Sequence, residues 1–259
     1  MRPILFTIFD FPVRSYGLFI AIGFLAGLWL AKRVAARRRP EYVPLIEEFA
    51  FVAFVSAIAG ARIWEVTFTW EAYRDNLWHI FALWHGGLSI QGAIVGGALA
   101  AFWFARKHKL SFWDFADTLV PGVLLGQAIG RIGSCFLNGD AYGKPTGSSF
   151  GVIYAPGTPA YEAFGPVRLW PAELFEGFWD LALMFLMLRL LKQERPQGSV
   201  VLWYAILYSV GRFTLEFLRA DSLTFMGLKA AQVTSLLIAT AAAVGLLLMA
   251  RRSRHTTSA

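Results

Sequence analysis

Long apolar runs are the feature that most constrains how this chain can fold. Each run is long enough to cross a bilayer as a helix rising about 1.5 Å per residue. Only 16% of the residues are charged, against about 25% in soluble domains. We therefore predict an all-α integral membrane protein, a single polytopic domain over residues 1–259 with about seven transmembrane helices. The predicted spans are residues 16–34, 45–66, 88–105, 112–136, 172–191, 199–218 and 230–250.

The basic residues predict the orientation of these spans. Lysines and arginines gather after the first, third, fifth and seventh spans, and positively charged ends stay in the cytoplasm. The N-terminus is then outside and the C-terminus cytoplasmic. Residues 138–172 are rich in glycine and proline and too long for a simple hairpin, so we expect a small outside head between helices 4 and 5. The tryptophans of residues 67–87 suit an interfacial helix.

Composition also limits the classes of partner. The net charge is +7, but the basic clusters lie beside apolar runs and have no interleaved aromatic groove, so we expect no nucleic acid. Cys135 is the single cysteine, which excludes an internal disulfide and a CxxC metal site. We expect no metal and no organic cofactor. The N-terminus lacks a basic region and a small-residue cleavage site, so we expect no removable signal peptide.

Three arginines fall at the outer ends of predicted spans: Arg62, Arg131 and Arg212. Arginine in a bilayer is costly and points to an anion or a water-filled cavity. With no equal set of acids beside them, we expect the three to form an anion site, because a guanidinium fork matches phosphate oxygens. The alternative is structural, with snorkelling or pairing of Arg212 with Glu216 and Arg62 with Glu65. The residues alone leave both interpretations open.

The sixth span places Tyr208, Arg212 and Glu216 on one helix face at a spacing of four residues. A hydroxyl, a guanidinium and a carboxylate in a row can hold a phosphate and orient the arginine. A polar seam between helices is the alternative.

The third span opens from outside with Gly86, Gly87, Ser89 and Gln91. Glycines let a lipid head group approach backbone N–H groups at a helix N-terminus. Ser89 is not in a G-x-S-x-G elbow, so a serine hydrolase is weakly supported. His85 nearby is either structural or a base.

The stretch after Arg131 carries further polar groups. Asn138, Asp140 and Tyr142 follow it closely and are expected to line the mouth of the site. We interpret Cys135 as a small buried residue, because no neighbouring group is identified that would activate it as a nucleophile.

These motifs, taken together and in order, resemble the prolipoprotein diacylglyceryl transferases of bacteria. The resemblance covers nearly the whole chain. The matching segments are residues 12–18, 60–62, 84–89, 130–143 and 169–176, and Tyr208, Arg212 and Glu216.

The resemblance implies a reaction at the outer face of the bacterial cytoplasmic (inner) membrane. The diacylglyceryl group of phosphatidylglycerol, a membrane lipid, would pass to the lipobox cysteine thiol in a prolipoprotein signal peptide. A thioether would form and glycerol 1-phosphate would leave, so the nucleophile would belong to the substrate. The rival hypotheses are a membrane transporter or a binding protein for a phosphate-bearing anion or lipid.

The resemblance also implies roles for particular residues. Arg131 and Arg212 would clamp the phosphate, Tyr16 and Tyr208 would position the head group, and Glu216 would orient Arg212. These five are the expected catalytic residues. The expected substrate-binding residues are Arg62, Gly86, Gly87, Ser89, Gln91, Asn138, Asp140 and Gly143.

The chain departs from the family pattern at three places. Gln91 stands where the family often has a histidine cast as the base. Either that role is not essential, or another group serves, with His85, Tyr16 or a phosphate oxygen as candidates. Ser134 and Cys135 stand where one residue is usual. Residues 173 and 175 are glutamate and phenylalanine in place of glutamine and tyrosine.

Overall fold

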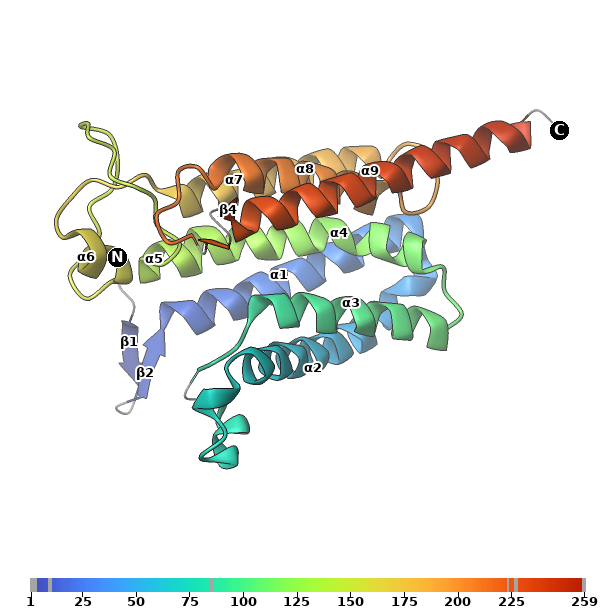
Figure 1. Cartoon of the computed structure of the whole chain (residues 1–259). Coiled ribbons are helices and arrows are strands. Elements are labelled where there is room, and N and C mark those ends of the chain that lie inside the picture. Colours follow the sequence, from blue (N-terminus) through green and yellow to red (C-terminus); the bar gives the residue numbers. More distant parts are fainter. Residues whose placement is uncertain (1–3, 9–10, 84–85, 223, 226–227, 258–259) are drawn as a thin grey trace. The chain divides into compact units, whose positions relative to one another are not determined.

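The computed structural model describes residues 4–8, 11–83, 86–222, 224–225 and 228–257. The chain is mostly helical, with two short antiparallel hairpins (Figure 1). It forms two compact units, one of residues 1–31 with 119–259 and one of residues 32–118.

Each of the seven segments predicted as spans corresponds to a helix in the structure. They are α1 (Ser15–Arg38), α2 (Val43–Phe68), α3 (Ile90–Lys107), α4 (Phe112–Ile129), α7 (Ala172–Leu190), α8 (Ser199–Leu215) and α9 (Ala230–Thr257). Among the described residues, four helical segments are long and apolar enough to cross a membrane, which makes this a multi-pass membrane protein. These four are Ser15–Arg38, Pro40–Phe68, Phe112–Asn138 and Ala230–Arg251.

In the unit of residues 32–118, α2 packs along α3 (Figure 1). Glycines make this contact close: a Cβ added to Gly60 would lie 2.4 Å from the Gly92 carbonyl oxygen, and one added to Gly96 would lie 2.3 Å from that of Ser56. In lipid, helix association depends on such close van der Waals packing.

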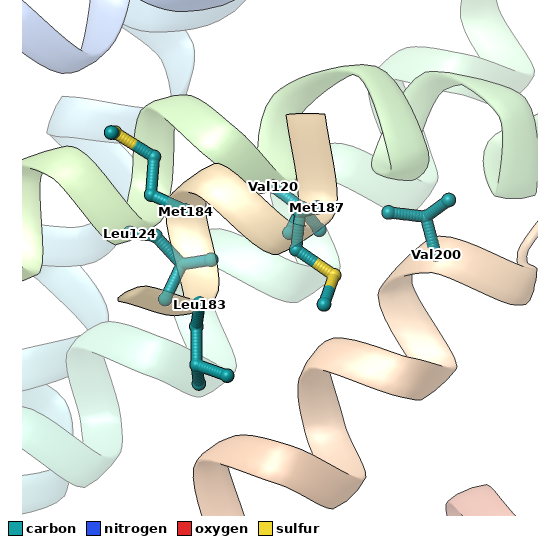
Figure 2. Close-up of a cluster of buried hydrophobic side chains, with 6 residues drawn as sticks. All are labelled: Val120, Leu124, Leu183, Met184, Met187 and Val200. Carbon is teal, nitrogen blue, oxygen red and sulfur yellow. The ribbon is translucent and has the colours of Figure 1, made fainter. Parts of the chain in front are cut away.

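The other unit is built on α4, α7, α8 and α9, with the first part of α1. Gly27 of α1 meets Gly122 of α4 so closely that an added Cβ would lie 2.6 Å from the Gly122 carbonyl oxygen. Figure 2 shows the apolar core that α4, α7 and α8 share. Its residues are Val120, Leu124, Leu183, Met184, Met187 and Val200. Dense packing here fixes the helices that carry the polar residues described below.

Two segments differ from the sequence predictions. Residues 67–87 do not form an interfacial helix; among their described residues are two short 3₁₀ turns, η2 (Trp70–Ala72) and η3 (Leu77–Ile80). The chain before α1 forms a hairpin of β1 (Ile4–Ile8) and β2 (Phe11–Arg14). Pro12 cannot donate a ladder hydrogen bond, which suits an edge position.

Residues 139–171 fold on themselves around a small apolar cluster of Tyr154, Ala160 and Leu169. They contain α6 (Pro159–Phe164), whose first turn is capped by Thr158. Val152 pairs with Leu169 through backbone hydrogen bonds.

Remaining elements connect the helices. They are η1 (Pro40–Tyr42), η5 (Gly130–Cys135), α5 (Phe136–Asn138), β3 (Thr224–Phe225) and β4 (Leu228–Lys229).

Candidate active site

A π-helical turn, η5, follows α4 and carries Arg131. A π turn holds one more residue than an α turn and often occurs at functional sites. The turn includes Ser134 and Cys135, the two residues that stand where one is usual in the motif that the sequence resembles. Gly133 is required in this turn, because an added Cβ would lie 2.0 Å from Cδ1 of Phe19.

One buried carboxylate gathers three arginines. Glu176 of α7 is 6% exposed. Its Oε2 lies 3.0 Å from Arg131 Nη2, and its Oε1 lies 3.0 Å from Arg212 Nη1 and 3.1 Å from Arg219 Nη1. Guanidiniums from η5, from α8 and from the segment after α8 therefore meet at one point.

Two further acids complete this group. Glu216 lies 2.5 Å from Arg212 Nη1, as the spacing along the sixth span predicted. Asp221 accepts from Arg219 Nε at 2.9 Å and from Nη2 at 2.6 Å. We call the whole set the arginine–carboxylate cluster: Arg131, Arg212, Arg219, Glu176, Glu216 and Asp221.

The expectation that the arginines lack an equal set of acids is therefore wrong. Arginines at low dielectric require counter-charges, since an unpaired buried charge is strongly destabilising. Glu176 is 36 residues from Arg212 and 43 from Arg219, so only the tertiary fold brings these partners together.

The three arginines differ in how much of each guanidinium is used. Arg219 is 9% exposed and uses Nε, Nη1 and Nη2 on carboxylates. Arg212 is 19% exposed and contacts both of its acids through Nη1. Its Nε and Nη2 make no hydrogen bond to any residue within the described ranges. Arg131 is 26% exposed and uses Nη2 on Glu176, while its Nη1 donates to Cys135 Sγ at 4.0 Å. Arg131 and Arg212 thus keep N–H groups for a ligand.

Both tyrosines expected in the site lie near these arginines. Tyr208 packs against the apolar core beside Tyr204 and lies within electrostatic reach of Arg131 and Arg212. Tyr16, half exposed at the start of α1, lies within the same reach of Arg131. All five expected catalytic residues therefore belong to one unit.

The loop after η5 runs beside the cluster. Asn138 Nδ2 donates to Asp140 Oδ2 at 2.9 Å, and Asp140 Oδ1 is buried without a partner among the described residues. Gly143 forms a bridge with Arg219. Its N–H donates to the Trp170 carbonyl at 3.0 Å, and an added Cβ would lie 2.3 Å from that oxygen. Glycine is therefore required at position 143.

Other contacts fix the surroundings of the cluster. The Lys229 ammonium donates to the backbone carbonyls of Glu216 and Arg219, and burial lowers its pKa. The Tyr154 hydroxyl donates to Glu173. Burial, and then the Glu173 carboxyl, raise the pKa of that phenol. The first contacts attach β4 to the end of α8, and the second attaches residues 139–171 to α7.

Arg62 is not the open cation that the sequence predicted. It is 6% exposed in the unit of residues 32–118. Its nitrogens donate to the Tyr73 hydroxyl and to the carbonyl oxygens of His79, Ile80, Gly86 and Gly87. Positive φ angles at both glycines suit such a turn. Arg62 satisfies loop carbonyls, because buried backbone oxygens require donors.

The start of α3 lies in that same unit. Ser89 Oγ donates to Gln91 Oε1 at 2.6 Å, and the Ser89 N–H donates to the Ala61 carbonyl. His85, the candidate base, lies outside the described residues.

Sequence reasoning missed Glu176, Arg219 and Asp221 as members of the site. Glu176 could have been predicted, since an acidic residue inside an apolar membrane helix indicates a functional site. Arg219 and Asp221 lie beyond the predicted span and gave none.

Two apolar cavities lie in the unit that contains the cluster. One, of about 290 Å³, is lined by residues that include Leu137 and Ile132, and Ile132 directly follows Arg131 in the chain. The other, of about 430 Å³, lies between α7 and α8 and is lined by residues that include Phe175 and Gly211, next to Glu176 and Arg212. Apolar space beside a polar cluster fits an amphiphilic ligand.

Comparisons with known proteins agree with this picture. The family model described as prolipoprotein diacylglyceryl transferase matches residues 3–248. Two relatives are named phosphatidylglycerol--prolipoprotein diacylglyceryl transferase. That of Thermosynechococcus vestitus is 40% identical over 229 residues, which is 86% of this chain and 84% of the relative. That of Gloeobacter violaceus is 39% identical over 259 residues, which is 97% of this chain and 94% of the relative. The chain therefore belongs to the prolipoprotein diacylglyceryl transferase family.

Proposed function

We propose that this protein transfers the diacylglyceryl group of phosphatidylglycerol to the cysteine thiol of a prolipoprotein, a step in lipoprotein maturation. The names of the relatives specify both substrates. The observation that carries the proposal is the arginine–carboxylate cluster, in which Arg131 and Arg212 share Glu176 and keep N–H groups available. A guanidinium edge of this kind binds a phosphate.

In the proposed reaction the substrate thiol sulfur attacks the glyceryl carbon that carries the phosphate. A carbon–sulfur bond forms, the carbon–oxygen bond to the phosphate breaks, and its electron pair stays on the phosphate oxygen. The thiol proton is released and glycerol 1-phosphate leaves. Arg131 and Arg212 stabilise the charge that develops on the phosphate, which is where preorganised donors contribute most.

Other residues position the substrates in this proposal. Tyr16 and Tyr208 hold the head group, and Glu216, in contact with Arg212, orients that guanidinium. The two apolar cavities receive acyl chains.

Two polar segments contact the substrates. In the segment after η5, Asn138 and Asp140 line the entrance to the active site, and Gly143 keeps the loop close to Trp170. At the start of α3, Ser89 and Gln91 bind substrate. The Gly86–Gly87 turn before them lets the lipid head group come close to the backbone.

The topology is part of the same proposal. Seven helices cross the bacterial cytoplasmic membrane, with the N-terminus outside and the C-terminus in the cytoplasm. The head of residues 138–172 and the active site are at the outer face. The distribution of lysine and arginine between the connecting segments supports this orientation.

The test uses the purified protein with phosphatidylglycerol carrying labelled acyl chains and a lipobox peptide. We expect a thioether-linked diacylglyceryl peptide and free glycerol 1-phosphate. Diacylglycerol, which lacks the phosphate, should give no product, and Arg212→Ala should lower the rate at least about 100-fold. Absence of transfer by the unmutated protein, or transfer that does not need the phosphate, would reject the proposal.

A further inference from the structure

Glu176 lies where a bound anion would be expected, between the guanidiniums of Arg131 and Arg212. We propose that Glu176 is a built-in counter-anion that lets the site release its phosphate product. It holds the two arginines in place for the phosphodiester of the lipid and weakens their hold on the more highly charged phosphate monoester that leaves. This inference rests on the proposed function and assigns a positioning role to Glu176.

The charges of the arginine–carboxylate cluster balance when all six groups are ionised. Three guanidiniums face three carboxylates, and Glu176 is the one carboxylate that contacts all three arginines. Without its charge the cluster would carry a net charge of about +1 by formal count.

Glu176 and a phosphate can be bound at the same time. The carboxylate occupies Arg131 Nη2 and Arg212 Nη1 and is itself 6% exposed. The arginine side chains are 26% and 19% exposed, and neither Arg131 Nε nor Arg212 Nε and Nη2 donate to another residue in the described part of the chain. A ligand therefore adds to the cluster without displacing Glu176.

The reaction changes the charge of the group that the arginines bind. A phosphodiester carries one negative charge, whereas a phosphate monoester carries about −1.5 to −2 near pH 7. Arginines without a counter-anion would attract the product more strongly than the substrate, because attraction scales with charge. Product would then remain bound and turnover would slow. The Glu176 charge reduces this difference.

The test is product inhibition of Glu176→Gln, which removes the charge and keeps the shape. We expect the inhibition constant of glycerol 1-phosphate to fall about tenfold. KM for phosphatidylglycerol should fall less, and kcat should fall because release becomes slow. Glu176→Asp keeps the charge and should restore inhibition close to that of the unmutated protein.

Glu173→Gln is the matched control, because Glu173 lies on the same helix and its carboxyl accepts from Tyr154. We expect it to leave the inhibition constant within about twofold. An unchanged or raised inhibition constant in Glu176→Gln would overturn the inference. Loss of activity without tighter product binding is the pattern of a purely structural role and would overturn it equally.

A second measurement uses the unmutated protein and does not depend on how the variant folds. Glycerol 1-phosphate and its methyl phosphodiester are compared as competitive inhibitors. With the counter-anion in place, their inhibition constants should agree within about threefold. A monoester that binds more than about tenfold tighter than the diester would overturn the inference. Absence of transfer by the unmutated protein would instead reject the proposed function.

Discussion

Arg131, Arg212 and Arg219 contact the same carboxylate, but they differ in what remains available for a ligand. Arg219 is nearly buried and its three nitrogens contact acids. Arg131 and Arg212 are more exposed and use one nitrogen each on Glu176. We infer that Arg219 stabilises the cluster and that the other two bind substrate.

Arg219→Gln should therefore act on stability. It leaves Glu176 and Asp221 with a missing partner, and breaking a buried ion pair costs about 3 kcal/mol or more. Unfolding of the purified protein in detergent measures the change in the free energy of unfolding. Arg168→Gln, at an exposed arginine, should change it by less than about 0.5 kcal/mol. Equal stability of the two variants would contradict this role for Arg219.

For single residues, the sequence predicted where polar side chains lie in the helices better than it predicted which residues they contact. Arg131, Arg212 and Tyr208 were found because charged and polar residues are rare in apolar spans. The Arg212–Glu216 contact followed from helix periodicity. The contacts with Glu176 and the carbonyl partners of Arg62 depend on how distant segments pack, which periodicity does not encode.

At the scale of elements, the long helices were predictable and the short ones were not. An apolar run of membrane length has to satisfy its backbone hydrogen bonds internally, so it forms a helix. The hairpin of β1 and β2 and the turns η2 and η3 are short, and tertiary contacts decide their form. The π turn η5 was not predicted, although the extra residue at Ser134 and Cys135 marked its place.

Neighbouring glycines of α3 give a matched test of helix packing. A Cβ at Gly96 would lie 2.3 Å from the Ser56 carbonyl oxygen, whereas one at Gly97 has nothing within 4 Å. Gly96→Ala should destabilise the protein by about 1–3 kcal/mol, because backbone has to move. Gly97→Ala should be neutral or stabilise it by up to about 1 kcal/mol, because alanine loses less entropy in a helix. Thermal unfolding in detergent compares them, and similar losses in both would contradict the close contact of α2 and α3.

At the scale of the whole molecule, the chain combines the sequence of a transferase family with several helices of membrane length. The family model covers residues 3–248, whereas four segments meet the length and apolarity of a membrane span among the described residues. The orientation proposed here rests on the basic residues of the connecting segments.

Labelling of single cysteines tests that orientation. In a Cys135→Ser background, Ser148→Cys in the head should react with a membrane-impermeant maleimide added to intact cells. Glu194→Cys, between α7 and α8, should react only after the membrane is permeabilised, because the proposed topology places that segment in the cytoplasm. Both positions are exposed. The opposite pattern of labelling would reverse the proposed topology.

The central claim is that Arg131 and Arg212 bind the phosphate of phosphatidylglycerol through planar guanidinium forks. The most direct test is kcat/KM for diacylglyceryl transfer by Arg131→Lys, which keeps the positive charge beside Glu176 and removes the fork. We predict a loss of about 100-fold or more with little change in melting temperature, while Arg168→Lys stays within about twofold of the unmutated protein. Near-normal transfer by folded Arg131→Lys would contradict the claim.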